Sequence, residues 1–545
     1  MPPSPAAGTD ERLRIVLATF MPDGQVTHSL AMRALKSYLV HRGPASSVEI
    51  SLKSYALGPT ARDTAVSQIV AVDPHIVGFS TYLWNGGQVK EVARRIRERA
   101  RTPPLVVAGG PEVDHAPESY LREGHLDVVA LGEGEEILRR LVETRLQGER
   151  RFDDIPNLVY RDGSSIVQTR RDHAFVEDLA SHDFPLILDA DPHWCFAYET
   201  SRGCYFRCRY CKFDPAGARV IRYYPMDKVK GDLEQIFALP ALKMVVFNDS
   251  NFFRPTDRRR GLDIMELVHE LNARRTSSGL EPLIVATMQN PMFLDAETCA
   301  TLKRLPLHGG TVQCGLQTID LEVSRKVLDR CFNRHSTLRK LEELSAILGD
   351  RLSVDVMYGL PGETLEGYRR SLEFVLSLRS SHLGMCHFHV LPGSYFADHS
   401  DDYGLEYQSE PPHRLISSST WTPDDLARAA RLSYAVYLFY CEYFFPCFGS
   451  VKTVIRSEIR GDLVPMFDRI VAYLERCHPE LFGRWVQSFG ASQLDGLKEA
   501  MRFVQKTTNA PLVDEMLREV TALVEEYAAE QRQAQAAEQA RQPVS

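Results

Sequence analysis

The chain repeats one pattern twice: short runs of Val, Ile and Leu alternate with longer amphipathic segments of helical period. In the first series the runs predict strands at 14–20, 48–52, 76–80, 105–108 and 128–131, with helices at 30–41, 89–101 and 135–146. Short apolar strands that alternate with helices are typical of a parallel α/β sheet with helices on both faces. Residues 1–150 are therefore predicted to form a doubly wound, Rossmann-like α/β domain.

Polar residues and glycines follow the strands of this first series. Doubly wound sheets bind ligands in the crevice outside the carboxyl ends of their strands, and glycine lets the backbone approach a ligand closely. Each loop taken alone could equally be a tight strand-to-helix turn. No Gly-x-Gly-x-x-Gly follows the first strand, which argues against a nicotinamide or flavin site. We predict ligand contacts at this edge from Ser80, Thr81, Gly109, Gly110, Gly132 and Glu133.

The second series predicts six β/α units, fewer than the eight of a complete barrel. Its expected strands are 195–200, 244–248, 283–287, 311–317, 353–358 and 385–390, and its expected helices include 227–237, 263–275 and 368–378. A partial (β/α)6 barrel is therefore predicted for residues 191–400. Residues 151–190 are expected to be a connector that contains a hairpin. Residues 401–545 are expected to form a helical C-terminal domain whose Gln/Ala-rich tail is frayed.

Charge and composition restrict the partners. The 72 acidic and 64 basic residues give a net charge of −8, which argues against a general electrostatic hold on nucleic acid or an anionic membrane. The apolar stretch 432–449 is interrupted by Glu442 and Pro446 and is too short to span a bilayer comfortably. No basic segment and apolar run open the chain, so we expect a cytoplasmic protein without a signal peptide. In that compartment clustered cysteines indicate metal or redox chemistry rather than disulfides.

Three of the eleven cysteines, Cys204, Cys208 and Cys211, have the spacing C-x3-C-x2-C. They directly follow the first strand of the second series, so they are expected on a loop at the carboxyl edge of the barrel. Three thiolates can hold three irons of a [4Fe–4S] cluster and leave the fourth iron open. A structural zinc site is the alternative, but it normally needs four ligands, for which Cys195 or His193 would have to serve.

With this motif on the first loop of a partial barrel, the chain resembles the radical S-adenosylmethionine (SAM) enzymes. The resemblance implies that SAM chelates the open iron through its amino and carboxylate groups. It also implies SAM contacts at four further places. Tyr210 matches an aromatic position near the adenine, Asn248-Asp249-Ser250 stands where the family usually has Gly-Gly-Glu, Gln317 closes the fourth strand, and Gly359 belongs to the Gly-rich segment of the fifth.

A doubly wound domain ahead of such a barrel is similar to the cobalamin-binding domain of the class B radical SAM enzymes. The loops at 77–82, 106–111 and 129–134 are similar to loops of that domain. Asp73-Pro-His75-Ile-Val-Gly78 matches a pattern that other cobalamin proteins use to ligate cobalt. Here the pattern leads into the third strand, so His75 is expected at the opposite edge of the sheet. His28 opens a helix and is expected to be solvated, so cobalamin is predicted to bind without a histidine ligand.

The class B resemblance implies a radical SAM C-methyltransferase. One SAM would methylate cob(I)alamin, a second would be cleaved to the 5′-deoxyadenosyl radical, and the methyl group would pass to a carbon of a small-molecule or peptide substrate. The expected cofactors are a [4Fe–4S] cluster, SAM and cobalamin, and the expected electron donor is a flavodoxin or ferredoxin. The alternatives are ring contraction or oxidative cyclisation without methylation, RNA modification, and a non-catalytic cobalamin or iron–sulfur sensor. Net acidity and the lack of a recognisable helix-turn-helix argue against the last two.

An aromatic-rich stretch at 434–448 completes the sequence features. Aromatic residues on several faces of a helix indicate burial, so we expect core packing there. The alternative is that part of the stretch, including Tyr437 and Tyr440, lines a substrate pocket.

Overall fold

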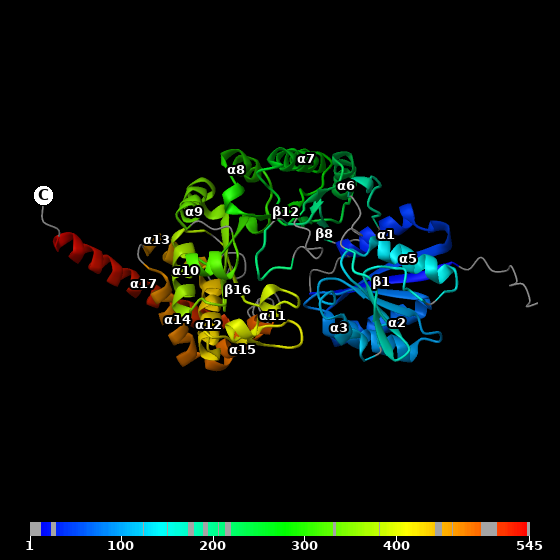
Figure 1. The fold of residues 1–545 in the computed structure, drawn as a ribbon. Helices are drawn as coiled ribbons and strands as arrows, with labels where there is room; N and C mark the ends of the chain where they lie inside the picture. Colours follow the sequence, from blue (N-terminus) through cyan, green and yellow to red (C-terminus); the bar gives the residue numbers. More distant parts are fainter. Residues whose placement is uncertain are drawn as a thin grey trace, which may run out of the picture.

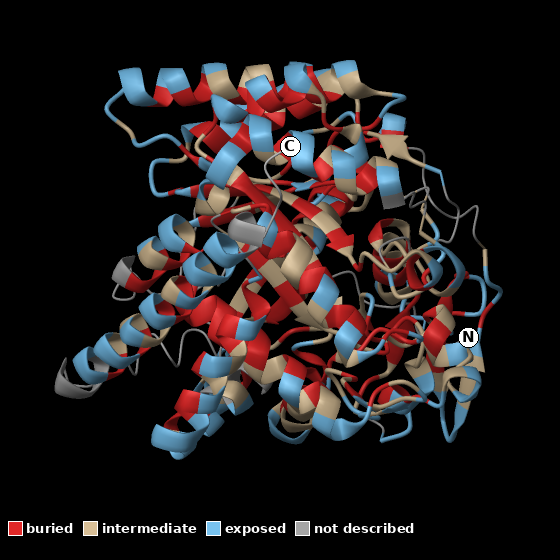
Figure 2. Ribbon diagram, turned by 90° about the vertical axis from the view of Figure 1, so that its left-hand side faces the viewer, coloured by how far each residue is buried: buried red, intermediate tan, exposed pale blue. Residues whose placement is uncertain are grey.

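The computed structural model describes residues 12–22, 29–123, 125–149, 151–172, 179–188, 194–204, 206–212, 220–330, 334–380, 382–441, 449–459, 462–491 and 510–541. The parts of the chain follow one another along an arc (Figure 1). The N-terminal α/β domain occupies one end, the barrel strands and helices lie in the middle, and the C-terminal helices occupy the other end. Buried residues follow the sheets and the inward faces of the helices, and the outward faces are exposed (Figure 2).

The N-terminal domain is a seven-stranded sheet in the order β2-β1-β3-β4-β5-β6-β7. Its first five strands are parallel: β1 Leu13–Met21, β2 Val48–Ala56, β3 Ile76–Ser80, β4 Leu105–Gly109 and β5 Val128–Ala130. The helices are α1 Leu30–Arg42, α2 Pro59–Val72, α3 Gly86–Arg99, α4 Pro117–Leu121 and α5 Glu135–Leu146. Alternate residues of β1 enter two separate apolar cores, one with α2 and α3 and the other with α1 and α5. The doubly wound prediction is therefore confirmed.

The expected hairpin is part of this sheet. It consists of β6 Leu158–Asp162 and β7 Ser165–Gln168, and β6 pairs antiparallel with β5. The segment that we expected to connect two domains thus extends the first one. The physical reason is that Leu158, Val159 and Tyr160 are buried in the cores of the N-terminal domain.

The barrel has six parallel strand positions, as predicted. In order they are β8 Cys195–Tyr198, β11 Met244–Phe247, β12 Ile284–Ala286 continued by β13 Met288–Gln289, β14 Val312–Gln317, β15 Leu352–Tyr358 and β16 His382–His387. Its helices are α6 Met226–Ala238, α7 Arg258–Ser277, α8 Ala296–Lys303, α9 Arg334–Leu348 and α10 Leu365–Ser377. A two-stranded ladder of β9 Ser201–Arg202 and β10 Arg222–Tyr223 follows β8. The last strand begins and ends about three residues before the predicted 385–390, because Phe388 and Val390 continue the buried run beyond the strand.

The C-terminal part is mainly helical. Its elements are α11 Tyr395–Asp398, β17 Glu406–Tyr407, β18 Leu415–Ser417, α12 Pro423–Phe439, α13 Gly449–Glu458, α14 Val464–Cys477, α15 Pro479–Ala491 and α17 Ala510–Arg541. The tail that we expected to fray continues the last helix to Arg541, because Ala, Gln, Glu and Arg are strong helix formers. None of the helices among the described residues is both long and apolar enough to cross a bilayer.

The aromatic stretch packs into the core where the structure describes it. Tyr434, Phe439 and Tyr440 are fully buried and Tyr437 is 6% exposed. The Tyr437 hydroxyl accepts a hydrogen bond from the backbone N–H of Met385, at a distance of 2.8 Å, on strand β16. Residues 442–448 of the stretch lie outside the described residues. For the described members, packing favours the core interpretation.

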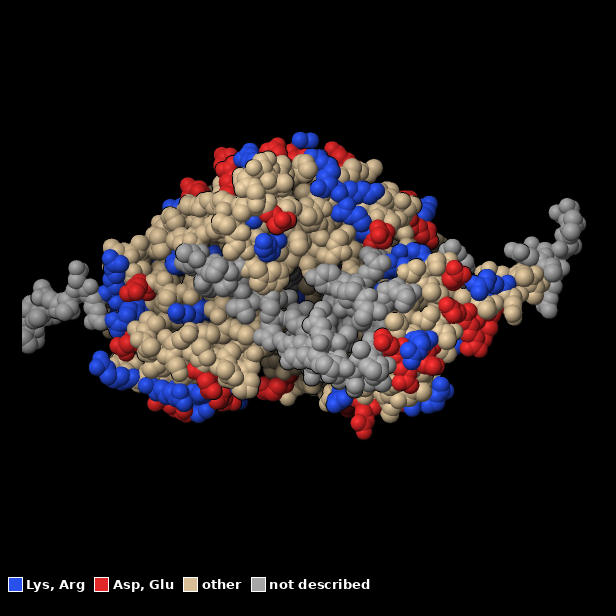
Figure 3. All heavy atoms as spheres, turned by 180° about the vertical axis from the view of Figure 1, so that it is seen from behind, with Lys and Arg blue, Asp and Glu red and all other residues tan. Residues whose placement is uncertain are grey.

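Acidic and basic side chains lie near one another on the face shown in Figure 3. Ion pairs also join helix α7 to α8 and its flanking residues: Arg258 contacts Asp295 and Glu297, and Arg304 contacts Glu266 at 2.7 Å. The charges on the face in view are mixed in sign.

Glu363, in the loop after β15, gives the barrel an expected pH dependence. The side chain is 2% exposed, accepts a hydrogen bond from the Thr318 hydroxyl, and burial raises its pKa from 4.5 to about 8. The folded protein thus holds a proton that the unfolded chain releases above its ordinary pKa. This contribution to stability is full below pH 4.5 and is lost as the pH rises through about 8. Glu363→Gln should therefore unfold at a higher temperature than the wild type at about pH 8.5, by an amount worth on the order of 1–4 kcal/mol.

Thermal unfolding of both proteins at about pH 5.5 and about pH 8.5 measures this difference. Glu366→Gln, at an exposed glutamate of the next helix, is the matched control and should leave the midpoint unchanged at both pH values. Equal midpoints of Glu363→Gln and wild type at the higher pH would show that Glu363 is ionised in the folded protein.

Candidate active site

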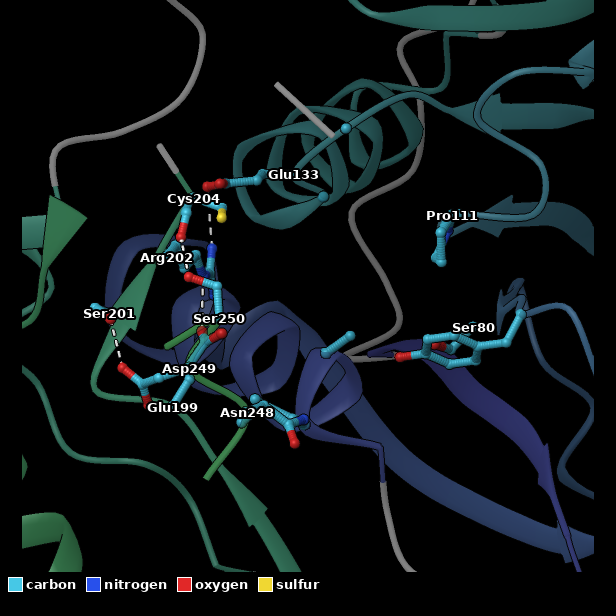
Figure 4. Close-up of a pocket in the computed structure, with 18 of the residues that line it drawn as sticks. Ser80, Pro111, Glu133, Glu199, Ser201, Arg202, Cys204, Asn248, Asp249 and Ser250 are labelled. Carbon is cyan, nitrogen blue, oxygen red and sulfur yellow. Dashed lines mark hydrogen bonds and ion pairs between the residues drawn. The ribbon is translucent and has the colours of Figure 1, made fainter. Parts of the chain in front are cut away.

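A cavity of about 680 Å³ lies between the carboxyl edge of the N-terminal sheet and the carboxyl ends of the barrel strands. Residues that follow β3, β4 and β5 line one side of it, and residues that follow β8, β11, β13 and β14 line the other. In the close-up of Figure 4, Ser80 and Pro111 lie across the cavity from Cys204, Asn248 and Ser250. The two predicted ligand edges therefore face one shared space.

Cys204, Cys208 and Cys211 all line this cavity. The backbone N–H of Cys211 donates to the carbonyl of Cys208 at 2.9 Å, so the loop turns tightly between these two thiols. Among the described residues no three metal-ligating side chains converge on one point. A mononuclear zinc site needs such convergence, whereas each thiolate of an iron–sulfur cluster binds a different iron. Cys195, the proposed fourth zinc ligand, lies buried at the opposite, amino end of β8, and His193 lies outside the described residues.

Arg330, which the sequence analysis missed, lies against the cysteine loop. Its guanidinium donates to the Tyr210 hydroxyl at 2.5 Å and to the Gly315 carbonyl at 3.1 Å, and it lies 3.8 Å from the Cys208 sulfur. Burial raises the pKa of Tyr210, so its hydroxyl stays protonated. Arg330 and Tyr210 both line the cavity. Because Arg330 has no motif spacing to the cysteines, no local signal in the sequence indicated it.

The predicted SAM contacts after β11 have different surroundings. The Asn248 side chain is exposed to the cavity. Asp249 is 2% exposed, and its carboxylate accepts hydrogen bonds from the N–H and hydroxyl of Thr200, at 3.0 and 2.8 Å, and from the Ser201 hydroxyl. Burial raises the pKa of Asp249. The Ser250 hydroxyl donates to the Gly203 carbonyl at 2.8 Å. Asp249 and Ser250 therefore tie the loop after β11 to the segment ahead of Cys204.

Gln317 lines the cavity, whereas Asp355, on the neighbouring strand β15, is not among the lining residues. Gln317 has a φ of 71°, and its side chain covers Gly315, the neighbour of Asp355 on β14. On its other side Asp355 pairs with Gly384 of β16, and its carboxylate occupies the space that a Cβ at Gly384 would need. Burial raises its pKa to about 6. Asp355 was not predicted from the sequence, although one acidic residue inside an otherwise apolar strand was an available signal.

Two predicted contacts lie outside the cavity lining. Gly359, with a φ of 84°, is covered by Leu426 and Leu415, which a Cβ at this position would meet at 3.0 and 3.3 Å. It therefore allows α12 and β18 to pack closely. Thr81 is fully buried, and its backbone N–H donates to the Gly109 carbonyl at 2.8 Å. Thr81 thus supports the cavity-lining residue Gly109, and Gly359 serves the packing of α12 and β18.

The remaining predicted contacts at the edge of the N-terminal sheet line the cavity: Ser80, Gly109, Gly110, Gly132 and Glu133. Gly110 has a φ of 118°, and a Cβ there would collide with the Thr81 carbonyl. Behind these loops the cavity continues as an apolar slot between the sheet and helices α1 and α5. Its walls are Leu17, Met32, Leu35, Gly78, Val107, Ala130, Ile137, Leu138 and Leu141. Because these walls are apolar, the slot suits a largely apolar group rather than a charged one.

Glu133 is held by arginines. Its carboxylate pairs with Arg202 at 3.0 Å and with Arg222. We predicted a ligand contact from this side chain, but its charge is already compensated by two residues of the barrel.

The two histidines considered as cobalt ligands are placed as follows. His75 lies at the amino end of β3, where its Nδ1 accepts the backbone N–H of Arg14 at 3.0 Å, so it is at the opposite edge from the cavity, as predicted. His28 lies outside the described residues. The described residues that line the cavity include no histidine.

Comparison with protein families identifies the two domains. A B12 binding domain matches residues 14–142, and the Radical SAM superfamily matches residues 198–375. The chain therefore has a B12-binding domain followed by a radical SAM domain, the organisation of the class B, cobalamin-dependent radical SAM enzymes.

Two curated relatives align with more than half of this chain. The chain is 26% identical over 399 residues to 2-(S-pantetheinyl)-carbapenam-3-carboxylate methyltransferase of Streptantibioticus cattleyicolor, which covers 70% of this chain and 56% of that protein. It is 27% identical over 380 residues to the cobalamin-dependent radical SAM methyltransferase TokK of Streptomyces tokunonensis, and the match covers 65% of this chain and 53% of that protein. The aligned region thus spans about half the length of these relatives.

Two solved structures share the fold across most of the chain. The radical SAM methyltransferase TsrM of Kitasatospora setae superposes with a TM-score of 0.60 at 16% identity, covering 91% of this chain and 99% of that one. The cobalamin-dependent SAM radical enzyme OxsB superposes with a TM-score of 0.62 at 13% identity, covering 98% and 82%. At these identities the similarity is one of fold, and it confirms the predicted architecture.

Proposed function

We propose that this protein is a cobalamin-dependent radical SAM C-methyltransferase that transfers a methyl group from SAM, by way of cobalamin, to a carbon of a small-molecule or peptide natural-product precursor. The observation that carries the proposal is the shared cavity. The three thiols and the ligand edge of the B12-binding domain open to the same cavity. A cofactor bound at either side could therefore act on one substrate between them.

The described residues fit cobalamin. Gly109 and Gly110 at the sheet edge leave room for the face of a corrin, and the apolar slot between the sheet, α1 and α5 would take its nucleotide tail. At Gly78, in the wall of the slot, a Cβ would approach Leu17 Cδ2 to 2.7 Å, so a larger residue would not fit there. The proposed binding mode needs no histidine from the chain.

The described residues also fit a cluster with SAM. Cys204, Cys208 and Cys211 would hold three irons. The Arg330 guanidinium is suited to pair with a carboxylate of SAM, and Gln317, which lines the cavity, could accept a hydrogen bond from a ribose hydroxyl. Together the bound cofactors would supply methyl transfer and hydrogen-atom abstraction, while the chain orients the substrate and excludes water. An acidic electron carrier such as flavodoxin or ferredoxin would reduce the cluster in the cytoplasm.

Anaerobic reconstitution with iron, sulfide, hydroxocobalamin and labelled SAM tests the proposal. A methyltransferase of this kind should bind cobalamin, gain the cluster spectrum, and form both S-adenosylhomocysteine and 5′-deoxyadenosine. Formation of 5′-deoxyadenosine alone would favour ring contraction or oxidative cyclisation. Binding of both cofactors without any cleavage of SAM, over a panel of substrates, would favour a sensor.

Arg330→Met should weaken SAM binding by roughly 10- to 100-fold, because a charge-assisted hydrogen bond to the carboxylate of SAM would be lost. Anaerobic calorimetric titration of the reconstituted protein with SAM measures the effect. Arg325→Gln, at an exposed arginine of the same segment, should bind SAM like the wild type. An unchanged Kd for Arg330→Met would remove Arg330 from the SAM site.

A further inference from the structure

A cluster of ion pairs joins the B12-binding domain to the barrel at the wall of the cavity. Arg202 contributes three of them: its Nη1 lies 3.0 Å from Glu133, its Nη2 lies 2.6 Å from Glu135, and its Nε lies 2.7 Å from Glu199. Glu133 belongs to the loop between β5 and α5 and Glu135 is the first residue of α5, whereas Arg202 and Glu199 belong to the barrel. Figure 4 shows the Glu133 side chain pointing toward Arg202 on the barrel side.

The geometry of this cluster depends on the planar fork of Arg202. The side chains of Glu133, Glu135, Glu199, Arg202 and Arg222 are only 11–18% exposed. They comprise three carboxylates and two guanidiniums, so repulsion among the carboxylates must be balanced at short range. Arg202 is the member that contacts all three. A guanidinium presents its donors at fixed angles, which a lysine ammonium cannot do.

Arg202 is also coupled to the cysteine loop. It stands two residues before Cys204, and Gly203 between them has a φ of 101°, a conformation in which a Cβ would collide with the Val220 carbonyl. The Gly203 carbonyl accepts the Ser250 hydroxyl at 2.8 Å. Arg202 therefore joins Glu133 and Glu135 to the closely packed segment that leads into the first cluster thiol.

Other contacts hold the two domains together away from the cavity. The Arg33 guanidinium lies 4.4 Å from the centre of the Phe196 ring, the Ser37 hydroxyl accepts the Ile187 N–H at 2.8 Å, and Arg42 donates to the Ser181 carbonyl at 2.8 Å. None of these α1 residues lines the cavity. The Arg202 cluster is thus at the place where interdomain contact and the cavity wall coincide.

We propose that Arg202 is a positioning residue, which sets the distance across the cavity between the loop 132–134 and the cysteine loop, and with it the spacing between cobalamin and cluster-bound SAM. The inference rests on the proposed function for the identity of the two cofactors. If so, the spacing requires the planar fork of the Arg202 guanidinium and not only its positive charge. Cofactor loading depends on other residues and should not need it.

Arg202→Lys tests this, because the substitution keeps the charge and removes the fork. We expect iron and cobalamin contents like those of the wild type and methylated product reduced roughly 10- to 100-fold, as for a small misplacement of reacting groups. The readout independent of activity is the relaxation of the cob(II)alamin EPR signal by the reduced cluster, which depends on their separation. It should be weaker in Arg202→Lys, since the loop is free to retreat.

Arg42→Gln is the matched control: it removes an interdomain contact distant from the cavity and should change neither the EPR relaxation nor the product yield. Arg202→Gln/Glu135→Gln, which loses one charge of each sign, provides a second test should the lysine variant not fold; it should show the same weakened relaxation. Unchanged relaxation and yield in a folded Arg202 variant would overturn the inference. A wild type that loads both cofactors but transfers no methyl group would instead overturn the proposed function, and the EPR comparison would still test the spacing.

Discussion

Cys208→Ala is expected to abolish both the iron–sulfur cluster and the cleavage of SAM while leaving cobalamin bound. Cys208 lies in the cavity beside Arg330, and with its thiolate removed only two of three iron ligands remain. Because the motif supplies only three cysteine ligands for four irons, it contains no fourth cysteine that could replace the lost one. Iron and sulfide should fall from about four each per chain to background, and neither 5′-deoxyadenosine nor methylated product should form.

Cys386→Ala is the matched control for this experiment. Cys386 is a half-buried cysteine on β16, and its loss should leave iron content and turnover near the wild type. Iron analysis and the visible spectrum of the anaerobic protein give the result, and cobalamin is quantified in the same sample. If Cys208→Ala retained full iron and turnover, the assignment of the cluster ligands would be wrong.

Gly109→Val is expected to have the opposite selectivity: loss of cobalamin with the cluster retained. Gly109 ends β4 and lines the cavity, and a Cβ there would meet only Ala130, at 3.7 Å. Its φ is not positive, so a valine adds no backbone strain, and its methyl groups must project into the space proposed for cobalamin. Cobalamin binding should weaken at least about tenfold, or about 1.4 kcal/mol, and methyl transfer should fall with it.

Gly231→Val controls for the introduction of a branched side chain, because Gly231 lies in α6 with open space around it. It should bind cobalamin normally. The bound cobalamin per chain after desalting and the iron content are the two measurements. Normal cobalamin binding by Gly109→Val would place the corrin elsewhere, and the interpretation of the slot would then have to change.

The elements of the fold could be predicted because they are encoded locally. The apolar strands, most of them three to nine residues long, and the helices between them carry their periodicity in consecutive residues, and the cysteines carry their spacing within one loop. The placement of these loops at a shared cavity followed from a general rule for parallel sheets, that ligand sites gather at carboxyl ends.

Contacts between distant segments could not be predicted in this way. Arg202 meets Glu133 across 69 positions of the sequence, and Arg330 meets Cys208 across 122. Nothing in the local spacing of these residues indicates a partner. The packing of α12 and β18 over Gly359, which we expected to contact SAM, likewise has no local signal in the sequence. Nor could the hydrogen bonds of the Asp249 carboxylate with Thr200 and Ser201 be predicted; Asp249 lines the cavity, and its contact with SAM stays a prediction.

The hairpin β6–β7 determines where the chain can be divided. Strand β5 has only three residues, and its outer edge is covered by β6 through the pairs Val128–Tyr160, Val129–Val159 and Ala130–Leu158. A fragment that ended near residue 150 would leave this strand with unpaired backbone groups at an open edge, which invites association with other chains. A self-contained B12-binding unit therefore has to include the hairpin and the residues directly after it, because Thr169 and Arg170 hydrogen-bond to Leu158 and Asn157. Exchange of this unit between related enzymes would have to carry the hairpin along.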